Sequence, residues 1–422
     1  MHRNPPCQNG RSSLRRLLVA LVVLATATAG LTAPASAKAG KGDVDVIVKF
    51  EWGVDAATAA QDLGYPIVEA VFEHRRIYLL DVNAKDSKKA DEVAEELELD
   101  QRVRWAEPEM HGKSAEAERF RAWPSETRPT EATEADYRNQ SAITDAIAGV
   151  HGTATGAGVR VAVLDTGVDR RHPALAGHVK LRLDMVDGDW NPEDVGNGVD
   201  DDGDGFVDES VGHGTHVAGI IRLIAPDAEI LAYRVLDSDG QGTVVGVAEA
   251  ITHAVDAGAD VINVSFGTDK DQKSRLLRTA LQYARDNDVA IVAAAGNDGD
   301  DKKRYPASDD RIVSVAAYDQ TATDLAVFAT HGKWIDVAAP GVDITSAIPG
   351  GGYAAWSGSS MAAPFVAGQL ALLVEASGGA PVEQLVAHVT ESAEDVKGKG
   401  KGKDKREIGK GLVKIRDSVH RL

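Results

Sequence analysis

Short apolar runs alternate with amphipathic stretches along most of the chain. In its first part, a period-two or apolar pattern typical of strands covers residues 43–50, 76–82 and 103–108. A helical pattern covers residues 55–64 and 87–100, and residues 66–72 leave room for one more strand. These elements predict a small α+β unit of βαββαβ order over about residues 43–109.

The pattern changes from about Gly158 onward. Largely apolar runs, most of them ending in glycine or a polar residue, occupy residues 159–167, 229–236, 260–267, 289–297 and 312–317. Helical stretches lie between them at residues 215–224, 244–258 and 272–288. Buried strands that alternate with helices predict an α/β fold, a mostly parallel sheet flanked by helices. In such folds the functional site lies beyond the carboxyl ends of the strands.

The N-terminus has the pattern of an export signal. Arg11, Arg15 and Arg16 precede an apolar run, and the small residues Ala35-Ser36-Ala37 follow it. This pattern predicts a signal peptide over residues 1–37 and a secreted, extracellular protein. A membrane anchor is the alternative, but the apolar run is short, so we expect no stable membrane insertion. The sequence leaves open whether export uses the general or the twin-arginine route.

The composition limits the classes of partner that the protein is expected to bind. Of the 422 residues, 46 are Lys or Arg and 65 are Asp or Glu, which gives a formal net charge of −19. An acidic surface argues against nucleic acid as a partner, because binding to phosphates rewards basic faces. The single cysteine, Cys7, lies in the predicted signal peptide, so the mature chain can form no disulfide. Bound metal is then one candidate for extracellular stability.

Polar residues at the predicted strand ends carry the candidate chemistry. Asp165 and Asn297 follow apolar strands, His213 opens a helix after a glycine-rich turn, and Ser359-Ser360 opens the helix of residues 361–376. Each alone is more simply a turn or cap residue, and His213 with His216 could be half of a metal pair. Together they fit nucleophilic catalysis, since a serine hydroxyl needs a histidine base held by a carboxylate.

Five ordered motifs, VAVLDTGVD, GHGTHVAG, VINVSFG, AAAGN and GSSMAAP, resemble those of the subtilisin-like serine proteases. The resemblance covers about residues 137–422 and implies that family's subtilisin-like fold. It implies that Asp165 orients the imidazole, that His213 is the general base and then acid, and that Asn297 donates to the oxyanion. Local chemistry does not choose between the two serines, whereas the family motif selects Ser360 as the nucleophile, with Ser359 in the place of the usual threonine.

The resemblance also implies a backbone-pairing site for an extended peptide. The matching stretches are Ser265-Phe266-Gly267 and the segment containing Gly240 and Gly242. Glycines let a substrate backbone approach closely and pair as an added strand. Simple turn chemistry is the alternative for both segments.

An acidic segment between Asp165 and His213 follows a calcium-loop spacing. Its candidate ligands are Asp200, Asp202, Asp204 and Asp208, with a turn glycine at Gly205. The twelfth position is Val211, so the usual glutamate is missing, and a merely solvated acidic loop is the alternative. The family's usual calcium aspartate is replaced by Ala174. We expect this segment to bind a structural Ca²⁺ instead.

The resulting domain hypothesis has four parts. A signal peptide (1–37) precedes an inhibitor-like propeptide domain (38–112), a linker with the processing site (113–136) and a subtilisin-like peptidase domain (137–422). The expected protein is a monomeric serine endopeptidase made as a zymogen, with polypeptides as substrates and its own propeptide as inhibitor and folding aid. The alternatives are a non-catalytic secreted calcium-binding protein on a protease scaffold, or an esterase. A retained binding domain is the alternative for residues 38–112.

Overall fold

The computed structural model describes residues 44–114, 130–268, 272–321, 324–394 and 408–422. All of them belong to one compact unit, Ala35–Leu422. The predicted signal peptide, most of the predicted linker and the lysine- and glycine-rich run at residues 397–406 lie outside the described residues.

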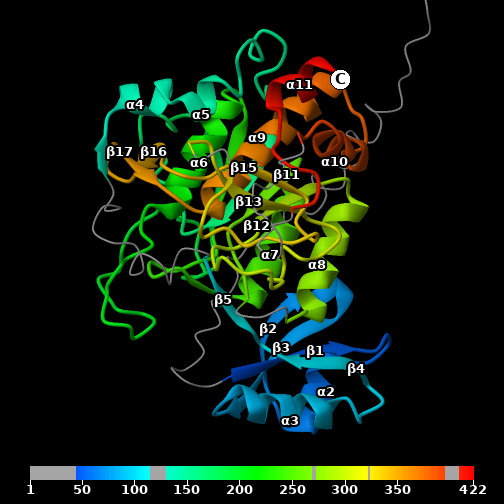
Figure 1. Cartoon of the computed structure of the whole chain (residues 1–422). Coiled ribbons are helices and arrows are strands. Elements are labelled where there is room, and N and C mark those ends of the chain that lie inside the picture. Colours follow the sequence, from blue (N-terminus) through cyan, green and yellow to red (C-terminus); the bar gives the residue numbers. More distant parts are fainter. Residues whose placement is uncertain (1–43, 115–129, 269–271, 322–323, 395–407) are drawn as a thin grey trace, which may run out of the picture. The chain divides into compact units, whose positions relative to one another are not determined.

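The first domain is an antiparallel sheet with two helices on one face (Figure 1). The strands, in sheet order, are β2 (Ile67–Phe72), β3 (Ile77–Ala84), β1 (Val44–Phe50) and β4 (Val103–Pro108), and the helices are α2 (Ala56–Leu63) and α3 (Ser87–Leu97). Along β1 the side chains alternate: Val46 and Val48 pack in the core beneath the helices, whereas Ile47 packs with residues of the second domain. The βαββαβ order is the predicted one.

The second domain is built on an eight-stranded, mostly parallel sheet. Its main path runs β14 (Asp324–Leu325), β13 (Val313–Asp319), β12 (Ala290–Ala294), β11 (Val261–Val264), β7 (Arg160–Asp165), β9 (Glu229–Arg234) and β8 (Val179–Asp184), and β15 (Val337–Pro340) pairs with β13. Only the β13–β14 pair is antiparallel among the described pairs of this sheet. The predicted fold class is therefore confirmed.

Helices cover both faces of this sheet (Figure 1). One face packs against α6 (His213–Ile224) and the long α9 (Ser359–Ser377), with α10 (Val382–Glu391) and α11 (Ile415–His420) beyond. The other face packs against α7 (Val244–Asp256) and α8 (Arg275–Asp286). The alternation along β7 explains this arrangement, because Val161 and Val163 point to the first face and Ala162 and Leu164 to the second.

Helix α9 is long and apolar enough to cross a membrane, the only such helix among the described residues, but most of it is buried in the protein. Its all-round apolar character therefore reflects a central position in the core. The domain is completed by α4 (Glu134–Asn139), α5 (Ser141–Thr144) and the three-stranded sheet β16 (Ile344–Ile348), β17 (Gly352–Trp356) and β6 (Thr130–Ala132).

The predicted linker of residues 113–136 begins and ends in regular structure. Lys113 belongs to β5 (His111–Lys113), which pairs with β10 (Gln241–Thr243), and the far end holds β6 and the start of α4. These short strands depend on partners more than 100 residues away, which local periodicity does not reveal.

Candidate active site

Asp165 and His213 form a direct hydrogen-bonded pair. Asp165 is the last residue of β7 and His213 the first of α6, and both side chains are buried. The Nδ1 of His213 lies 2.7 Å from the Oδ1 of Asp165. Gly214 permits this approach, since a Cβ there would lie 2.1 Å from the carbonyl oxygen of Gly167. With Nδ1 engaged by the carboxylate, Nε2 is the nitrogen that the imidazole can use for proton transfer.

His216 is not part of this pair. Its ring stacks on Trp356 with the ring centroids 4.8 Å apart, and its Nε2 lies 3.1 Å from the carbonyl oxygen of Ala354. These contacts fix His216 against β17, so the structure gives it a packing role in place of the half metal site that its spacing from His213 suggested.

Asn297 and the serine pair meet at the neighbouring strand end. Asn297 lies just beyond β12, and its Oδ1 accepts a hydrogen bond of 2.8 Å from the backbone N–H of Ser359. The Oγ of Ser359 accepts one of 3.1 Å from the N–H of Gly296. Ser359 therefore ties the start of α9 to the end of the sheet. Ser360, the next residue, is fully buried in the first turn of α9.

The four candidate residues come from adjoining elements. Strands β7 and β12 flank β11 in the sheet, and helix α6 packs against α9. The carboxyl ends of the two strands and the first turns of the two helices thus lie at one edge of the sheet, where the sequence places the site.

The predicted substrate segments hold a strand of the chain itself. In β5, Gly112 pairs with Gly242, and the N–H of Ser114 donates to the carbonyl of Gly240 over 2.9 Å. On the other side, the N–H and carbonyl of Lys113 each bond to Gly267 over 2.9 Å. Residues 111–114 therefore form the middle strand between the two segments.

Ser265 and Phe266 shape one wall of this groove. Ser265 continues from β11, and its N–H donates to the carbonyl of Leu164 over 3.4 Å. The ring of Phe266 lies directly against the α-carbon of Gly112, because a Cβ at that glycine would be 2.5 Å from its Cζ. A glycine is thus required where this strand crosses Phe266.

The acidic segment gathers three of its four candidate ligands. Carboxylate oxygens of Asp200, Asp202 and Asp204 all lie within 4.8 Å of one another. Asp208 is not in this group; its Oδ1 accepts backbone hydrogen bonds from Asn197 (2.8 Å) and Gly198 (3.2 Å). Asp208 has a left-handed backbone with φ 58°, so the chain turns away at the position where a linear calcium-loop spacing predicts a ligand.

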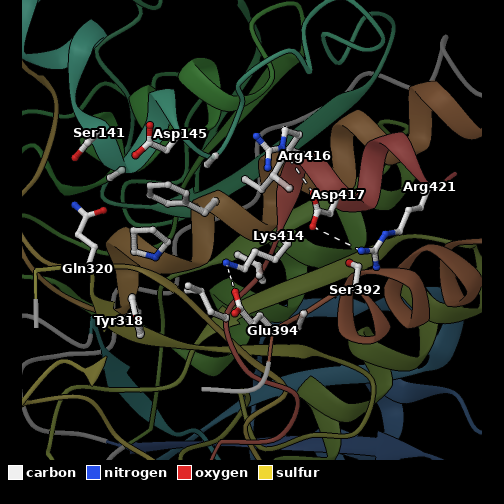
Figure 2. A pocket seen from close by; sticks show the side chains of 18 of the residues that line it. Ser141, Asp145, Tyr318, Gln320, Ser392, Glu394, Lys414, Arg416, Asp417 and Arg421 are labelled. Atoms are coloured by element: carbon white, nitrogen blue, oxygen red, sulfur yellow. Dashed lines mark ion pairs between the residues drawn. The ribbon is translucent and has the colours of Figure 1, made fainter. Parts of the chain in front are cut away.

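A separate cavity of about 560 Å³ lies between α5, α9, α10 and α11 (Figure 2). Several of its charged lining residues are paired with one another: Lys414 with Glu394, and Asp417 with Arg416 and Arg421 over 3.7 Å each. Its lining includes none of the predicted site residues, all of which the structure describes.

Sequence reasoning missed several buried carboxylates. Asp194 lies behind the His213 pair, while Glu107 and Glu109 of the first domain reach the N-termini of α8 and α7. Glu107 accepts from the Oγ of Ser274 over 2.7 Å and from the N–H of Arg275 over 2.8 Å. An isolated acidic residue in the sequence gives no sign of such burial.

Comparison with known proteins supports the family resemblance. The model of the subtilase family, peptidase family S8, matches residues 156–411. The chain belongs to the subtilase family. The model of the fervidolysin N-terminal prodomain matches residues 33–109, which include the first domain.

Named relatives agree with this assignment. The chain is 42% identical over 253 residues to a thermophilic serine proteinase of Bacillus sp. (strain AK1), covering 58% of this subtilase and 58% of the relative. It is 40% identical over 257 residues to thermitase of Thermoactinomyces vulgaris, covering 58% and 85%. The matched part therefore spans somewhat over half the length of the Bacillus proteinase.

The fold is also that of a solved structure. Fervidolysin from Fervidobacterium pennivorans superimposes with a TM-score of 0.71 over 90% of this chain and 61% of that chain, at 24% identity. The likeness supports the two-domain fold, with a prodomain ahead of the subtilisin-like domain.

Proposed function

We propose that this subtilase is a secreted serine endopeptidase made as a zymogen, with Ser360 as nucleophile. The observation that carries the proposal is the 2.7 Å bond between His213 and Asp165 at the sheet edge where α9 presents Ser360. Asp165 holds the imidazole in the tautomer that leaves Nε2 to accept the Ser360 proton. The Ser360 oxygen then bonds to the substrate carbonyl carbon, and the C–N bond breaks as His213 gives the proton to the leaving amine. Water, deprotonated by His213, then hydrolyses the acyl-enzyme, and the proton returns to the Ser360 oxygen.

Asn297 and the start of α9 supply the donors for the oxyanion. The Oδ1 of Asn297 accepts from Ser359, so its amide nitrogen is the group that this side chain offers to the developing charge. The backbone N–H of Ser360 belongs to the helix N-terminus, where the helix dipole also favours a negative charge.

Polypeptide substrates are proposed to bind as the strand of residues 111–114 does. That strand is held by backbone bonds to Gly240, Gly242 and Gly267, which recognise an extended peptide independently of most side chains. The same occupation explains inhibition, since a substrate strand needs the same backbone groups. From the sequence we expect the processing bond between about Met110 and Trp123, and because residues 111–114 are held in the groove we place it beyond Ser114. We expect the processed enzyme to be a monomer.

Asp200, Asp202 and Asp204 are proposed to hold a structural Ca²⁺. Three convergent carboxylates suit this hard cation, and waters or backbone oxygens complete its coordination. Bound calcium would neutralise the repulsion among these side chains. We expect it to stabilise the segment before α6 and to take no part in peptide hydrolysis.

Active-site labelling tests the proposal. A fluorophosphonate probe should label the wild type and not Ser360→Ala, and casein should be hydrolysed by the wild type alone. An unlabelled, inactive wild type would favour the calcium-binding scaffold, whereas turnover of esters without amides would favour an esterase. N-terminal sequencing of the secreted protein tests whether residues 38–112 are removed.

A further inference from the structure

Asp194 is a buried carboxylate that the proposed chemistry does not use. It lies between β8 and α6, and its side chain is 1% exposed. Its Oδ1 accepts from the N–H of Gly212 (2.8 Å) and from the Oγ1 of Thr166 (3.1 Å). Its Oδ2 accepts from the Oγ1 (2.6 Å) and the N–H (3.1 Å) of Thr215. One side chain thus receives four hydrogen bonds.

These partners bracket the proposed catalytic pair. Thr166 directly follows Asp165, Gly212 directly precedes His213, and Thr215 stands two residues after it. The Oγ1 of Thr166 also accepts from the N–H of Gly214 over 3.0 Å. Asp194 therefore joins the end of β7 to the first turn of α6 on both sides of the imidazole.

Helix α6 depends on this distant carboxylate. Its N-cap residue, Gly212, has no side chain that could accept from the first-turn N–H groups, and Asp194 accepts from one of them. Burial raises the pKa of Asp194 to about 6, against the lowering by its hydrogen bonds from Thr215 and Gly212. Above that pH the side chain is ionised and its four bonds are charge-assisted.

We propose that Asp194 is a positioning residue for catalysis, which fixes His213 against Asp165 through Thr166, Gly212 and Thr215. This inference rests on the proposed function. Asp194 does not contact the nucleophile or the substrate. Its role is to hold the end of β7 and the start of α6 together, because the distance between these two segments determines the position of the imidazole.

Asp194→Asn tests the inference in the processed enzyme. Two of the four partners are backbone N–H groups, which only donate, and two are hydroxyls, which can also accept. An amide therefore keeps at most three of the four bonds and turns its NH2 towards one of the backbone N–H groups. Misplacement of a catalytic group by about 1 Å costs on the order of a hundredfold in rate. We expect kcat to fall about ten- to a hundredfold while KM changes less than threefold, because the substrate strands are not altered.

Glu375→Gln is the matched control. The Oε2 of Glu375, in the last turn of α9, accepts from the N–H groups of Thr155 (2.7 Å), Gly156 (2.6 Å) and Ala157 (3.1 Å), so it too clamps a loop to a helix. The control should lower the melting temperature and leave kcat unchanged. A merely structural Asp194 would behave in the same way.

Two results would overturn the inference: wild-type kcat in Asp194→Asn, or equal kcat losses in Asp194→Asn and Glu375→Gln. Should Asp194→Asn not fold, Thr215→Val removes the 2.6 Å bond to Asp194, together with the 2.9 Å bond that the Thr215 Oγ1 accepts from the N–H of Asp169, and should still lower kcat severalfold. Wild-type kcat in that variant counts equally against the role. Failure of the proposed function has a different signature, namely equal activity in wild type and Ser360→Ala.

Discussion

The contact between prodomain and peptidase domain should weaken as pH rises. Glu69 on β2 and Glu249 on α7 share a side-chain hydrogen bond across this contact. Two ionised carboxylates both only accept, so the bond requires that one of them keeps its proton. Glu109, which follows β4 and is 6% exposed, lies close to both, with Asp45 behind it.

The pKa shifts determine the sign and the size of the pH dependence of prodomain binding. Burial raises the pKa of Glu69 and of Glu109 to about 7, and burial with the charge of Glu69 raises that of Glu249. After separation the carboxyls return to water, where a glutamate titrates near about 4.3. The bound state therefore holds more protons, and its affinity falls as pH rises from about 5 through 7. A pKa shift of this size in one carboxyl group changes the free energy of prodomain binding by about 3 kcal/mol, or the dissociation constant on the order of a hundredfold.

Dilution of the processed complex provides the assay. At each pH from 5 to 8, peptide hydrolysis by the diluted complex is divided by that of the prodomain-free enzyme at the same pH, which gives the fraction released. This fraction should rise steeply towards pH 8 in the wild type. Glu249→Gln, which stays neutral and can donate its amide to Glu69, should release a smaller fraction at pH 8 than the wild type, because only Glu69 and Glu109 then titrate. The exposed Glu383→Gln on α10 is the control and should match the wild type.

An equal released fraction at pH 5 and pH 8 would refute the proposed pH dependence of prodomain binding. A release profile in Glu249→Gln that equals the wild-type profile at every pH would refute it as well, because Glu249 would then contribute nothing to the pH dependence.

The other predictions concern catalysis, calcium and the inhibitory strand. Ser360→Ala and His213→Ala should be almost inactive towards a peptide substrate. Asn297→Ala should keep activity on the order of a hundredth to a thousandth of the wild type, which is the range seen in subtilisin when one oxyanion donor is removed. Equal losses of activity in all three variants would contradict these roles. EDTA should lower the melting temperature and excess calcium restore it, but not in Asp202→Asn; an unchanged wild type would exclude the metal site. Gly112→Leu should speed the appearance of activity at least tenfold, since the new side chain collides with the groove wall; slower activation would argue against the inhibitory strand.

Much of the site was predictable because parallel sheets place strand ends together. Asp165 and Asn297 were found as polar residues that directly follow apolar runs, and His213 and the serine pair as residues that open helices. The α/β alternation then requires these positions to meet at one edge. Local chemistry did not separate Ser359 from Ser360, since both are hydroxyls at the same helix start.

The remaining features were decided by tertiary structure. Pairing of residues 111–114 with Gly242 and Gly267 uses backbone groups, which leave no side-chain pattern in the sequence. Asp208 fits the calcium spacing, yet its carboxylate lies outside the group formed by Asp200, Asp202 and Asp204.

By itself, then, the sequence determined the order of strands and helices and the chemistry at their ends, because local periodicity and residue type encode both. Only the tertiary structure decided which acidic residues are buried and what they hold, because the burial of Asp194 or Glu109 depends on segments distant in the chain, and an aspartate or glutamate has the same sequence signal in the interior and on the surface.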